Sequence, residues 1–218
     1  MSKQLIDDTA AVEFLCKKDS KLRALIKRAG PFALKKRSTP STFEALANSI
    51  MRQQLAGSAA TAIALRVAAL GEDDEFPTPE QILDLPDKTL RAAGLSANKV
   101  LALRDLAIHT LGGTVPSSMK ELRRLSDQEI IDRLTVVRGI GQWTVEMILM
   151  FHLKRPDVLP VNDYGVRMGF ALTYGLAELP APRILEARGE KWRPYRSYAS
   201  WYFWQAVHLH RASGKNQG

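Results

Sequence analysis

Apolar residues recur at intervals of three and four along most of the chain, the spacing at which side chains share one face of a helix. No run alternates apolar and polar residues as a half-buried strand does. The pattern therefore predicts an all-α fold. The expected helices cover residues 9–18, 20–29, 42–54, 57–70, 79–84, 87–93, 97–111, 118–123, 127–135, 142–153, 163–174, 182–189 and 197–211.

Three of the expected helix starts carry capping signals. In a capping box, a serine or threonine side chain accepts the N–H of the third helical residue, and the glutamate or glutamine at that position reaches back to the main chain. A proline in the first turn adds to the signal, because its missing N–H has no partner there in any case. The three signals are Ser41 with Glu44, Thr78 with Pro79 and Gln81, and Ser126 with Glu129.

The composition is that of an ordinary globular protein, which excludes a disordered or fibrous chain: 45% of the 218 residues are hydrophobic and 25% are charged. Lysine and arginine (31) outnumber aspartate and glutamate (23), and the formal net charge of +8 is common among nucleic-acid-binding domains. Charge alone does not exclude a basic protein with no such partner.

Cys16 is the single cysteine, so the chain forms no internal disulfide, no four-thiolate iron–sulfur cluster and no cysteine-based zinc site. We therefore expect a reducing compartment. No stretch approaches the ~18 consecutive apolar residues needed to span a membrane, and the N-terminus lacks the apolar run of a secretion signal. The sequence predicts neither a secreted nor a membrane protein.

The most specific local pattern is LTVVRGIGQWT at 134–144, which predicts a helix-hairpin-helix within about 131–153. We expect Gly139 and Gly141 to adopt conformations closed to other residues and to let another backbone approach, while the next helix begins with unpaired N–H groups. Such a turn suits a phosphate. An ordinary turn with a capping glycine shares part of the pattern, but the apolar frame around the glycines favours binding to the DNA backbone.

Four ordered blocks make the chain resemble the helix-hairpin-helix superfamily of DNA base-excision glycosylases, most closely its 3-methyladenine-DNA glycosylase II branch. The blocks are SIMRQQLAGSAATAIALRVAAL at 49–70, LRAAGLSANKVLAL at 90–103, LTVVRGIGQWTVEMILM through VLPVNDYGVRMGF at 134–170, and RPYRSYASWYFWQA at 193–206. We expect two helical lobes around a DNA-binding cleft, one formed by residues 43–153 and the other by residues 1–42 with 154–218.

Asp163 opens the expected helix 163–174, where the helix dipole and unpaired N–H groups favour an ionised carboxylate. An aspartate that merely caps a helix gives the same pattern. The resemblance, through V-L-P-x-x-D-x-x-x-x-x-x-F at 158–170, implies that Asp163 is the catalytic residue. Its charge suits the task, because breaking an N-glycosidic bond develops positive charge on the sugar, and a carboxylate can also orient or deprotonate water.

Relatives that also cleave the DNA strand carry a lysine where this chain has Trp143. The amine that would form a Schiff base with the opened sugar is therefore absent from this position. The resemblance implies a monofunctional hydrolase that removes an alkylated purine of the 3-methyladenine type in base excision repair and leaves an abasic site.

A base in a duplex becomes accessible only after it is flipped into a pocket. Trp143 and Trp204 are the predicted walls of that pocket, with Met147 and Trp201 as further walls, and an electron-rich ring suits a cationic alkylated base. Burial in the core is the alternative for these large side chains.

Flipping leaves a hole in the duplex that an inserted side chain fills. By position in the family pattern, Leu55 is the predicted wedge and Gln54 its neighbour against the opposite strand. The alternative is that Leu55 merely ends a core helix.

The remaining predicted contacts are to the phosphate backbone, for which basic side chains and the hairpin are suited. We expect Arg193 or Arg196 to pair with acids instead, and the four histidines show no zinc spacing. The resemblance implies a Na⁺ or K⁺ ion on the carbonyls of Thr135, Val137 and Ile140, and no organic cofactor. The predicted backbone contacts are Arg138, Gly139, Gly141, Thr144 and Lys99.

The expected partner is double-stranded DNA with alkylated bases, bound by a monomer with no membrane involved. The corresponding location is cytoplasmic or nucleoid-associated in a prokaryote and nuclear in a eukaryote. Two alternatives stay open: a non-catalytic helix-hairpin-helix DNA-binding module, and a glycosylase for mismatched or oxidised bases. A pure binding module has no need of a carboxylate beside a tryptophan-lined pocket.

Overall fold

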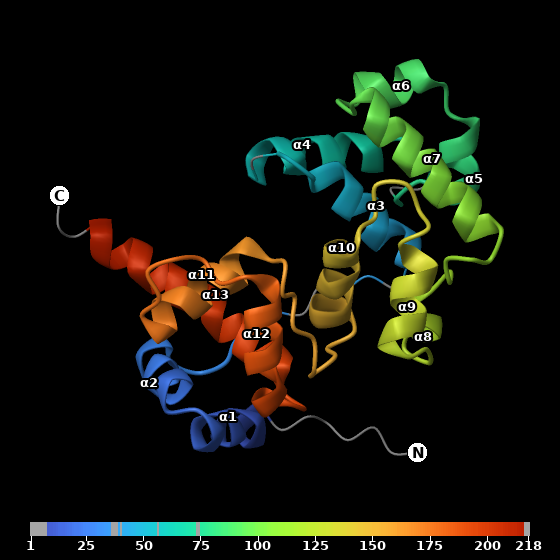
Figure 1. Cartoon of the computed structure of the whole chain (residues 1–218). Coiled ribbons are helices and arrows are strands. Elements are labelled where there is room, and N and C mark those ends of the chain that lie inside the picture. The colour runs from blue at the N-terminus through green and yellow to red at the C-terminus, as the bar shows by residue number, and fades with distance from the viewer. Residues whose placement is uncertain (1–7, 36–38, 40, 56, 73–74, 216–218) are drawn as a thin grey trace. The chain divides into compact units, whose positions relative to one another are not determined.

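The computed structural model describes residues 8–35, 39, 41–55, 57–72 and 75–215. Over these ranges every regular element is helical, and the one β-type contact is an isolated bridge between Ser41 and Ser118, which confirms the all-α prediction. The elements in Figure 1 are α1 (Asp8–Lys18), α2 (Ser20–Ala29), α3 (Thr42–Arg52), α4 (Gly57–Ala68), α5 (Pro79–Asp84), α6 (Asp87–Ala92), α7 (Ala97–Leu111), α8 (Met119–Leu122), α9 (Asp127–Leu134), α10 (Gln142–Met147), the π-helical turn η1 (Ile148–His152), α11 (Tyr164–Tyr174), α12 (Pro182–Gly189), the 3-10 turn η2 (Glu190–Trp192) and α13 (Arg196–Lys215).

Each expected helical segment overlaps one of these helices, and the differences lie at the ends. The segment expected at 142–153 is α10 followed by the π-helical turn from Ile148, and α13 runs to Lys215 rather than to 211. The helix expected to end at 54 is α3, which ends at Arg52.

The capping signals have three outcomes. Thr78 and Ser126 form complete capping boxes, as predicted. Ser41 also caps its helix, and its hydroxyl accepts the N–H of Glu44 at 3.1 Å. The carboxylate of Glu44 instead accepts the hydroxyl of Thr39 at 2.6 Å, so this start is a simple cap reinforced from outside the helix.

The chain divides into two compact units, which we call the hairpin unit (residues 37–148) and the terminal unit (residues 1–36 and 149–218). The sequence predicts boundaries between residues 42 and 43 and between residues 153 and 154. The first lies six residues after the observed boundary, and the second lies five residues after it. The DNA-binding cleft expected between the lobes stays a prediction.

The hairpin unit has a core of aliphatic side chains. Helix α7 packs against both α3 and α5 within it. The buried side chains that these three helices contribute include Leu46, Ile50, Met51, Ile82, Leu103 and Leu106.

The terminal unit has an aromatic core, in which Trp192, Tyr202 and Phe203 are fully buried. Its central contact is between α11 and α13, which lie side by side in Figure 1. A Cβ atom on Gly169 would lie 1.9 Å from the carbonyl oxygen of Phe203, so only glycine allows the two backbones to approach this closely. This contact holds the middle of α11 against α13 at Phe203, the residue before Trp204.

Asp19 is a buried carboxylate that joins three parts of the terminal unit. It caps α2, accepts the indole N–H of Trp192 at 3.1 Å and the ammonium of Lys191 at 2.6 Å, and is also hydrogen bonded by the hydroxyl of Tyr174. Burial opposes ionisation of Asp19, but the hydrogen bonds from Lys191, Tyr174, the Leu22 N–H and Trp192 outweigh it and lower the pKa to about 2. The side chain therefore ties α2, α11 and η2 together as a carboxylate.

Candidate active site

Asp163 is the N-cap of α11, as the sequence predicts, and its side chain is held by two donors. Its Oδ1 accepts the main-chain N–H of Val166 at 2.7 Å and the indole N–H of Trp204 at 2.9 Å. The first donor comes from the turn that Asp163 itself caps, and the second comes from α13. The carboxylate is partly exposed, so it has a fixed orientation and keeps access to solvent.

Gly165 makes the hydrogen bond from Trp204 possible. A Cβ atom at this position would lie 2.8 Å from Cδ1 of Trp204 and 3.1 Å from Oδ1 of Asp163. The indole therefore lies against the first turn of α11 where any other residue would push it away. The sequence reasoning missed Gly165, although its signal was present: it stands two residues after Asp163 and four before Gly169, on the same face of the helix.

Phe151 is a second residue that the sequence reasoning missed. Its ring stacks on Trp204 with centroids 5.8 Å apart and planes inclined by 19°. Trp204 thus has its N–H on the carboxylate and one face on Phe151. That Trp204 also forms a pocket wall stays a prediction.

Trp201 lies in the core of the terminal unit. Its ring is 9% exposed, with centroids 5.0 Å from Phe32 and 4.8 Å from Tyr202. Trp201 is therefore a core residue of the terminal unit, and its assignment as a pocket wall stays a prediction. Trp201 and Trp204 are three positions apart on α13 and therefore occupy neighbouring positions on its surface, Trp201 toward the core and Trp204 beside the carboxylate.

Trp143 and Met147 belong to the hairpin unit. Trp143 lies in the first turn of α10 and is 49% exposed, whereas Met147 ends the same helix and is partly buried. Because the predicted pocket takes residues from both units, its assembly stays a prediction. The exposure of Trp143 is what a ring available to a ligand requires.

The two glycines of the hairpin have different roles in the fold. Gly139 has φ +79°, a left-handed conformation that favours glycine. Gly141 has φ −94° and ψ 169°, which any residue adopts, and a Cβ atom there would meet nothing within 4 Å. The expectation that both glycines adopt conformations closed to other residues is therefore wrong for Gly141. Its missing side chain instead leaves open space at the start of α10.

Two of the predicted phosphate contacts at the hairpin differ in their surroundings. Thr144 is 5% exposed and its N–H donates to the carbonyl of Gly141 at 2.9 Å, so this residue is used inside the fold. Its assignment as a DNA contact stays a prediction. The side chain of Arg138 is exposed, while its N–H donates to Asp105 Oδ2 at 2.7 Å, and its predicted contact stays open.

Leu55 lies in the segment between α3 and α4, and 39% of it is exposed. The alternative that it ends a core helix is wrong, because α3 ends at Arg52. The preceding residue, Gln54, has φ +58°, a conformation uncommon for residues with a side chain. An apolar side chain is therefore presented to solvent from a constrained backbone, as a wedge requires.

Lys99 is hydrogen bonded to the main chain of the protein itself. Its ammonium donates to the carbonyls of Met51 and Gln53, each at 2.8 Å, at the end of α3. Burial lowers the pKa of Lys99. The negative end of a helix and its main-chain carbonyls attract a lysine, which accounts for these bonds, and the predicted phosphate contact stays a prediction.

Arg193 and Arg196 pair with acids, as expected. Arg196 Nε lies 2.7 Å from Asp157 Oδ1, and Arg193 Nη1 lies 2.6 Å from Asp157 Oδ2. A second acid, Glu190, lies 2.9 Å from Arg193 Nε. These ion pairs join the segment before α11, at Asp157, to the start of α13.

The carbonyls proposed for a monovalent ion are partly occupied, since that of Val137 accepts the N–H of Ile140 at 3.0 Å. The second lone pair of a carbonyl oxygen can still face an ion, so the site stays a prediction. Among the described residues, no three His, Cys, Asp or Glu side chains gather as a metal site. No helix in the described part of the chain is long and apolar enough to cross a membrane.

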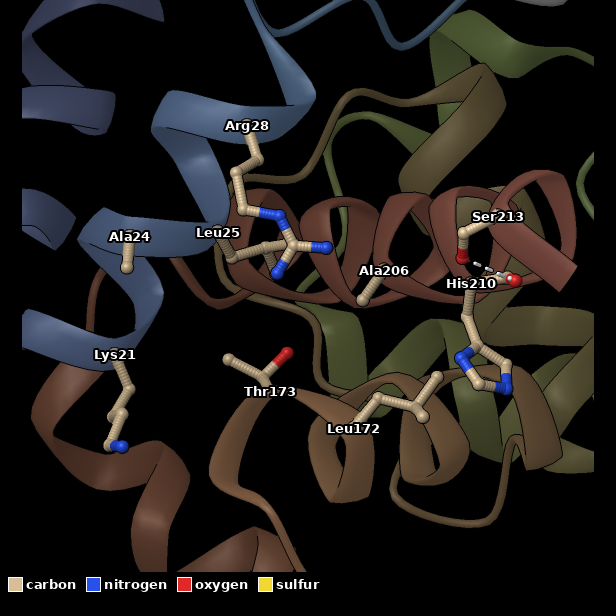
Figure 2. Close-up of a pocket in the computed structure, with 9 residues that line it drawn as sticks. All are labelled: Lys21, Ala24, Leu25, Arg28, Leu172, Thr173, Ala206, His210 and Ser213. Carbon is tan, nitrogen blue, oxygen red and sulfur yellow. Dashed lines mark hydrogen bonds between the residues drawn. The ribbon is translucent and has the colours of Figure 1, made fainter. Parts of the chain in front are cut away.

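A groove of about 380 Å³ lies in the terminal unit among α2, α11 and α13 (Figure 2). Two hydroxyls in it donate to their own helices, that of Thr173 to Gly169 at 2.6 Å and that of Ser213 to His210 at 2.9 Å. None of the residues that line it belongs to the predicted site. The lining consists of Lys21, Ala24, Leu25, Arg28, Leu172, Thr173, Ala206, His210 and Ser213.

Comparison with known proteins places these features in a family. Residues 47–194 match the HhH-GPD superfamily of base excision DNA repair proteins. The chain is 39% identical over 167 residues to DNA-3-methyladenine glycosylase 1 of Schizosaccharomyces pombe, an alignment that covers 77% of this chain and 73% of the relative.

Two solved structures are similar over nearly the whole chain. The 3-methyladenine DNA glycosylase of Schizosaccharomyces pombe in complex with abasic DNA has a TM-score of 0.80 and 36% identity, covering 90% of this chain and 95% of that one. The DNA-3-methyladenine glycosidase of Bacillus halodurans has a TM-score of 0.82 and 36% identity, covering 93% and 91%. The chain therefore belongs to the HhH-GPD superfamily of base excision DNA repair proteins.

Proposed function

We propose that this protein is a monofunctional DNA glycosylase that removes alkylated purines of the 3-methyladenine type from double-stranded DNA. Membership of a base excision repair superfamily and the names of its relatives support this activity. The observation that carries it is the carboxylate of Asp163, which two donors hold at the start of α11. A module that only binds DNA has no need of an oriented carboxylate.

The proposed reaction is hydrolysis at C1′ of the damaged nucleotide. The bond between C1′ and the base nitrogen breaks with its electron pair going to the base, and positive charge develops on the sugar. The negative charge of Asp163 stabilises that cation. A water molecule, oriented or deprotonated by the same carboxylate, then bonds to C1′ and leaves an abasic site. Water is the nucleophile, so the step needs no organic cofactor.

The residue at position 143 limits the reaction to hydrolysis. A glycosylase that also cleaves the strand forms a Schiff base between an amine and C1′. Trp143 has no amine, and its half-exposed ring instead suits a flipped base. An alkylated purine that carries positive charge is attracted to the face of such a ring, and its glycosidic bond is already weakened.

In this proposal the protein binds DNA mainly through the phosphate backbone of the duplex. The open space at Gly141 lets a phosphate approach the start of α10, and the contact is independent of base identity. Leu55 fills the hole that the flipped base leaves, with Gln54 beside it against the opposite strand. The formal net charge of +8 strengthens association with either damaged or undamaged duplex.

The test is to incubate the protein with duplexes that each carry one lesion and to identify the released base by chromatography. Release of 3-methyladenine supports the proposal. Release of an oxidised or mismatched base alone would keep the mechanism and change the substrate class. Binding to every duplex without release of any base would instead identify a DNA-binding module.

A further inference from the structure

Helix α7 contacts both elements that are proposed to meet DNA in the hairpin unit. We call residues 53–55 the wedge loop and residues 135–141 the hairpin. Lys99 on α7 binds the carbonyls of Met51 and Gln53, immediately before Gln54 and Leu55. One turn further along α7, Ala102 lies against Gly139, whose added Cβ would be 3.5 Å from that of Ala102.

The hairpin has two further attachments. Asp105 of α7 accepts the N–H of Arg138 at 2.7 Å. The side-chain amide of Gln53 donates to the carbonyl of Gly139 at 2.8 Å, which joins the wedge loop directly to the hairpin. The wedge loop, the hairpin and α7 thus form a closed set of contacts within one compact unit.

The backbone of the wedge loop needs such support. Gln54 has φ +58°, and a residue with a side chain holds a left-handed conformation only where its surroundings fix it. The two hydrogen bonds from Lys99 fix the carbonyl next to this residue and end α3 there. The direction in which the Leu55 side chain projects into solvent therefore depends on the ammonium of Lys99.

We propose that Lys99 is a positioning residue for the wedge: its ammonium fixes the end of α3 so that Leu55 enters the duplex in register with the phosphate gripped at the hairpin. The inference rests on the proposed function, because it assigns a role within base flipping. It distinguishes Lys99 from an ordinary phosphate contact, since its donors point to main-chain carbonyls of the protein.

The main variant is Lys99→Met, which keeps the length of the side chain and removes the ammonium. The matched control is Lys88→Met, which removes the same charge from an exposed position on α6. Two measurements distinguish a positioning role of Lys99 from a phosphate contact. Fluorescence of 2-aminopurine opposite the lesion reports flipping, and the salt dependence of binding to undamaged duplex reports phosphate contacts.

For Lys99→Met we expect the single-turnover release of 3-methyladenine and the 2-aminopurine signal to fall together. The rate should fall by about tenfold to a hundredfold, because a small misplacement of the wedge has an effect of that size. Affinity for undamaged duplex should match that of Lys88→Met, with the same salt slope. A slope lower by about 1 than that of the control would show a phosphate contact and overturn the proposal. Lys99→Arg, which can still reach the carbonyls, should restore most of the rate.

A double-mutant cycle with Leu55→Ala keeps the proposal testable if Lys99→Met also lowers stability. If Lys99 acts through the wedge, its substitution should have little further effect on flipping once Leu55 is already alanine. Fully additive effects would overturn the proposal. Wild-type protein that releases no base from any lesion would instead contradict the proposed function, so the two failures are distinguishable.

Discussion

Trp204 donates its indole N–H to Oδ1 of Asp163 at 2.9 Å, so a residue in the middle of α13 fixes the carboxylate that caps α11. The same oxygen accepts the N–H of Val166 at 2.7 Å. One donor is local in sequence and the other is 41 residues away. The orientation of the proposed catalytic group therefore depends on how the two helices cross.

Replacement of Asp163 by asparagine should abolish excision and leave DNA binding intact. The amide oxygen can still accept from Val166 and Trp204, but it carries no negative charge to stabilise the sugar cation. We expect single-turnover release of 3-methyladenine from alkylated duplex to fall by at least about a hundredfold. Affinity for an uncleaved duplex serves as the control, and unchanged release by this variant would contradict the assignment of Asp163.

Loss of the indole donor should slow excision without weakening DNA binding. Trp204→Phe keeps a ring that can stack on Phe151 and removes the N–H, so Asp163 loses an orienting donor. We expect the single-turnover rate to fall by about tenfold. Gly165→Ala should act similarly, because the new methyl group would displace the indole. Equal rates for wild type and Trp204→Phe would show that the hydrogen bond does not position the carboxylate.

No covalent adduct should form during turnover. Borohydride reduces a Schiff base between protein and opened sugar, and Trp143 cannot form one. We expect electrophoresis after borohydride treatment to show free protein and abasic DNA only. A Trp143→Lys variant provides the comparison for any gain of trapping. A trapped adduct with the wild type would require another amine and would refute the monofunctional assignment.

A negative charge at the hairpin should weaken binding to damaged and undamaged duplex by similar factors. Gly141→Asp places a carboxylate where the phosphate is proposed to lie, and φ −94° with open space around the Cβ predicts that the fold is kept. Single-turnover release from the saturated complex should fall less than affinity does. Binding is measured at matched salt, with helicity checked by circular dichroism and Gly141→Ala as the uncharged control. A well-folded Gly141→Asp variant with normal affinity would make the hairpin a packing turn only.

Stability should fall in acid through Asp19. Its pKa in the folded protein is about 2, below the value of 3.8 for an unperturbed aspartate, so its contribution is full above about pH 4 and is lost as pH falls through 2. The shift corresponds to about 2 kcal/mol. Urea unfolding of wild type and Asp19→Asn at pH 7 and pH 2.5 should show a difference that shrinks at the lower pH. A constant difference would show that the carboxylate charge is not what stabilises this junction.

Local signals in the sequence predict the helices well, and the long-range contacts of the site much less. Thr78 and Ser126 mark helix starts through residues three positions away, so their caps are readable from the sequence. The hydrogen bond from Trp204 to Asp163 depends on Gly165 and Gly169, whose lack of a Cβ matters only once α13 lies against α11. The spacing of glycines along one helix does not identify the helix that packs against them.

The same limit applies to residues whose surroundings the sequence does not reveal. Lys99 is basic and follows a motif of the family, but its role depends on the carbonyls of α3, which stand 46 and 48 positions earlier in the chain. Thr144 and Trp201 are polar or aromatic residues near functional ones, and tertiary packing alone decides that both are buried. Charge and residue type identify candidates, whereas the partner that a side chain meets decides between them.

The empty space at Gly141 also makes this position suitable for site-specific chemistry. A cysteine there would fit the backbone without strain and would stand at the point where a phosphate is proposed to lie. The natural thiol, Cys16, is partly buried in the terminal unit, and burial raises its pKa, so it reacts slowly with thiol reagents at neutral pH. A Gly141→Cys protein could therefore be labelled at the hairpin alone, and a disulfide to a thiol-modified DNA backbone would capture the complex for crystallography.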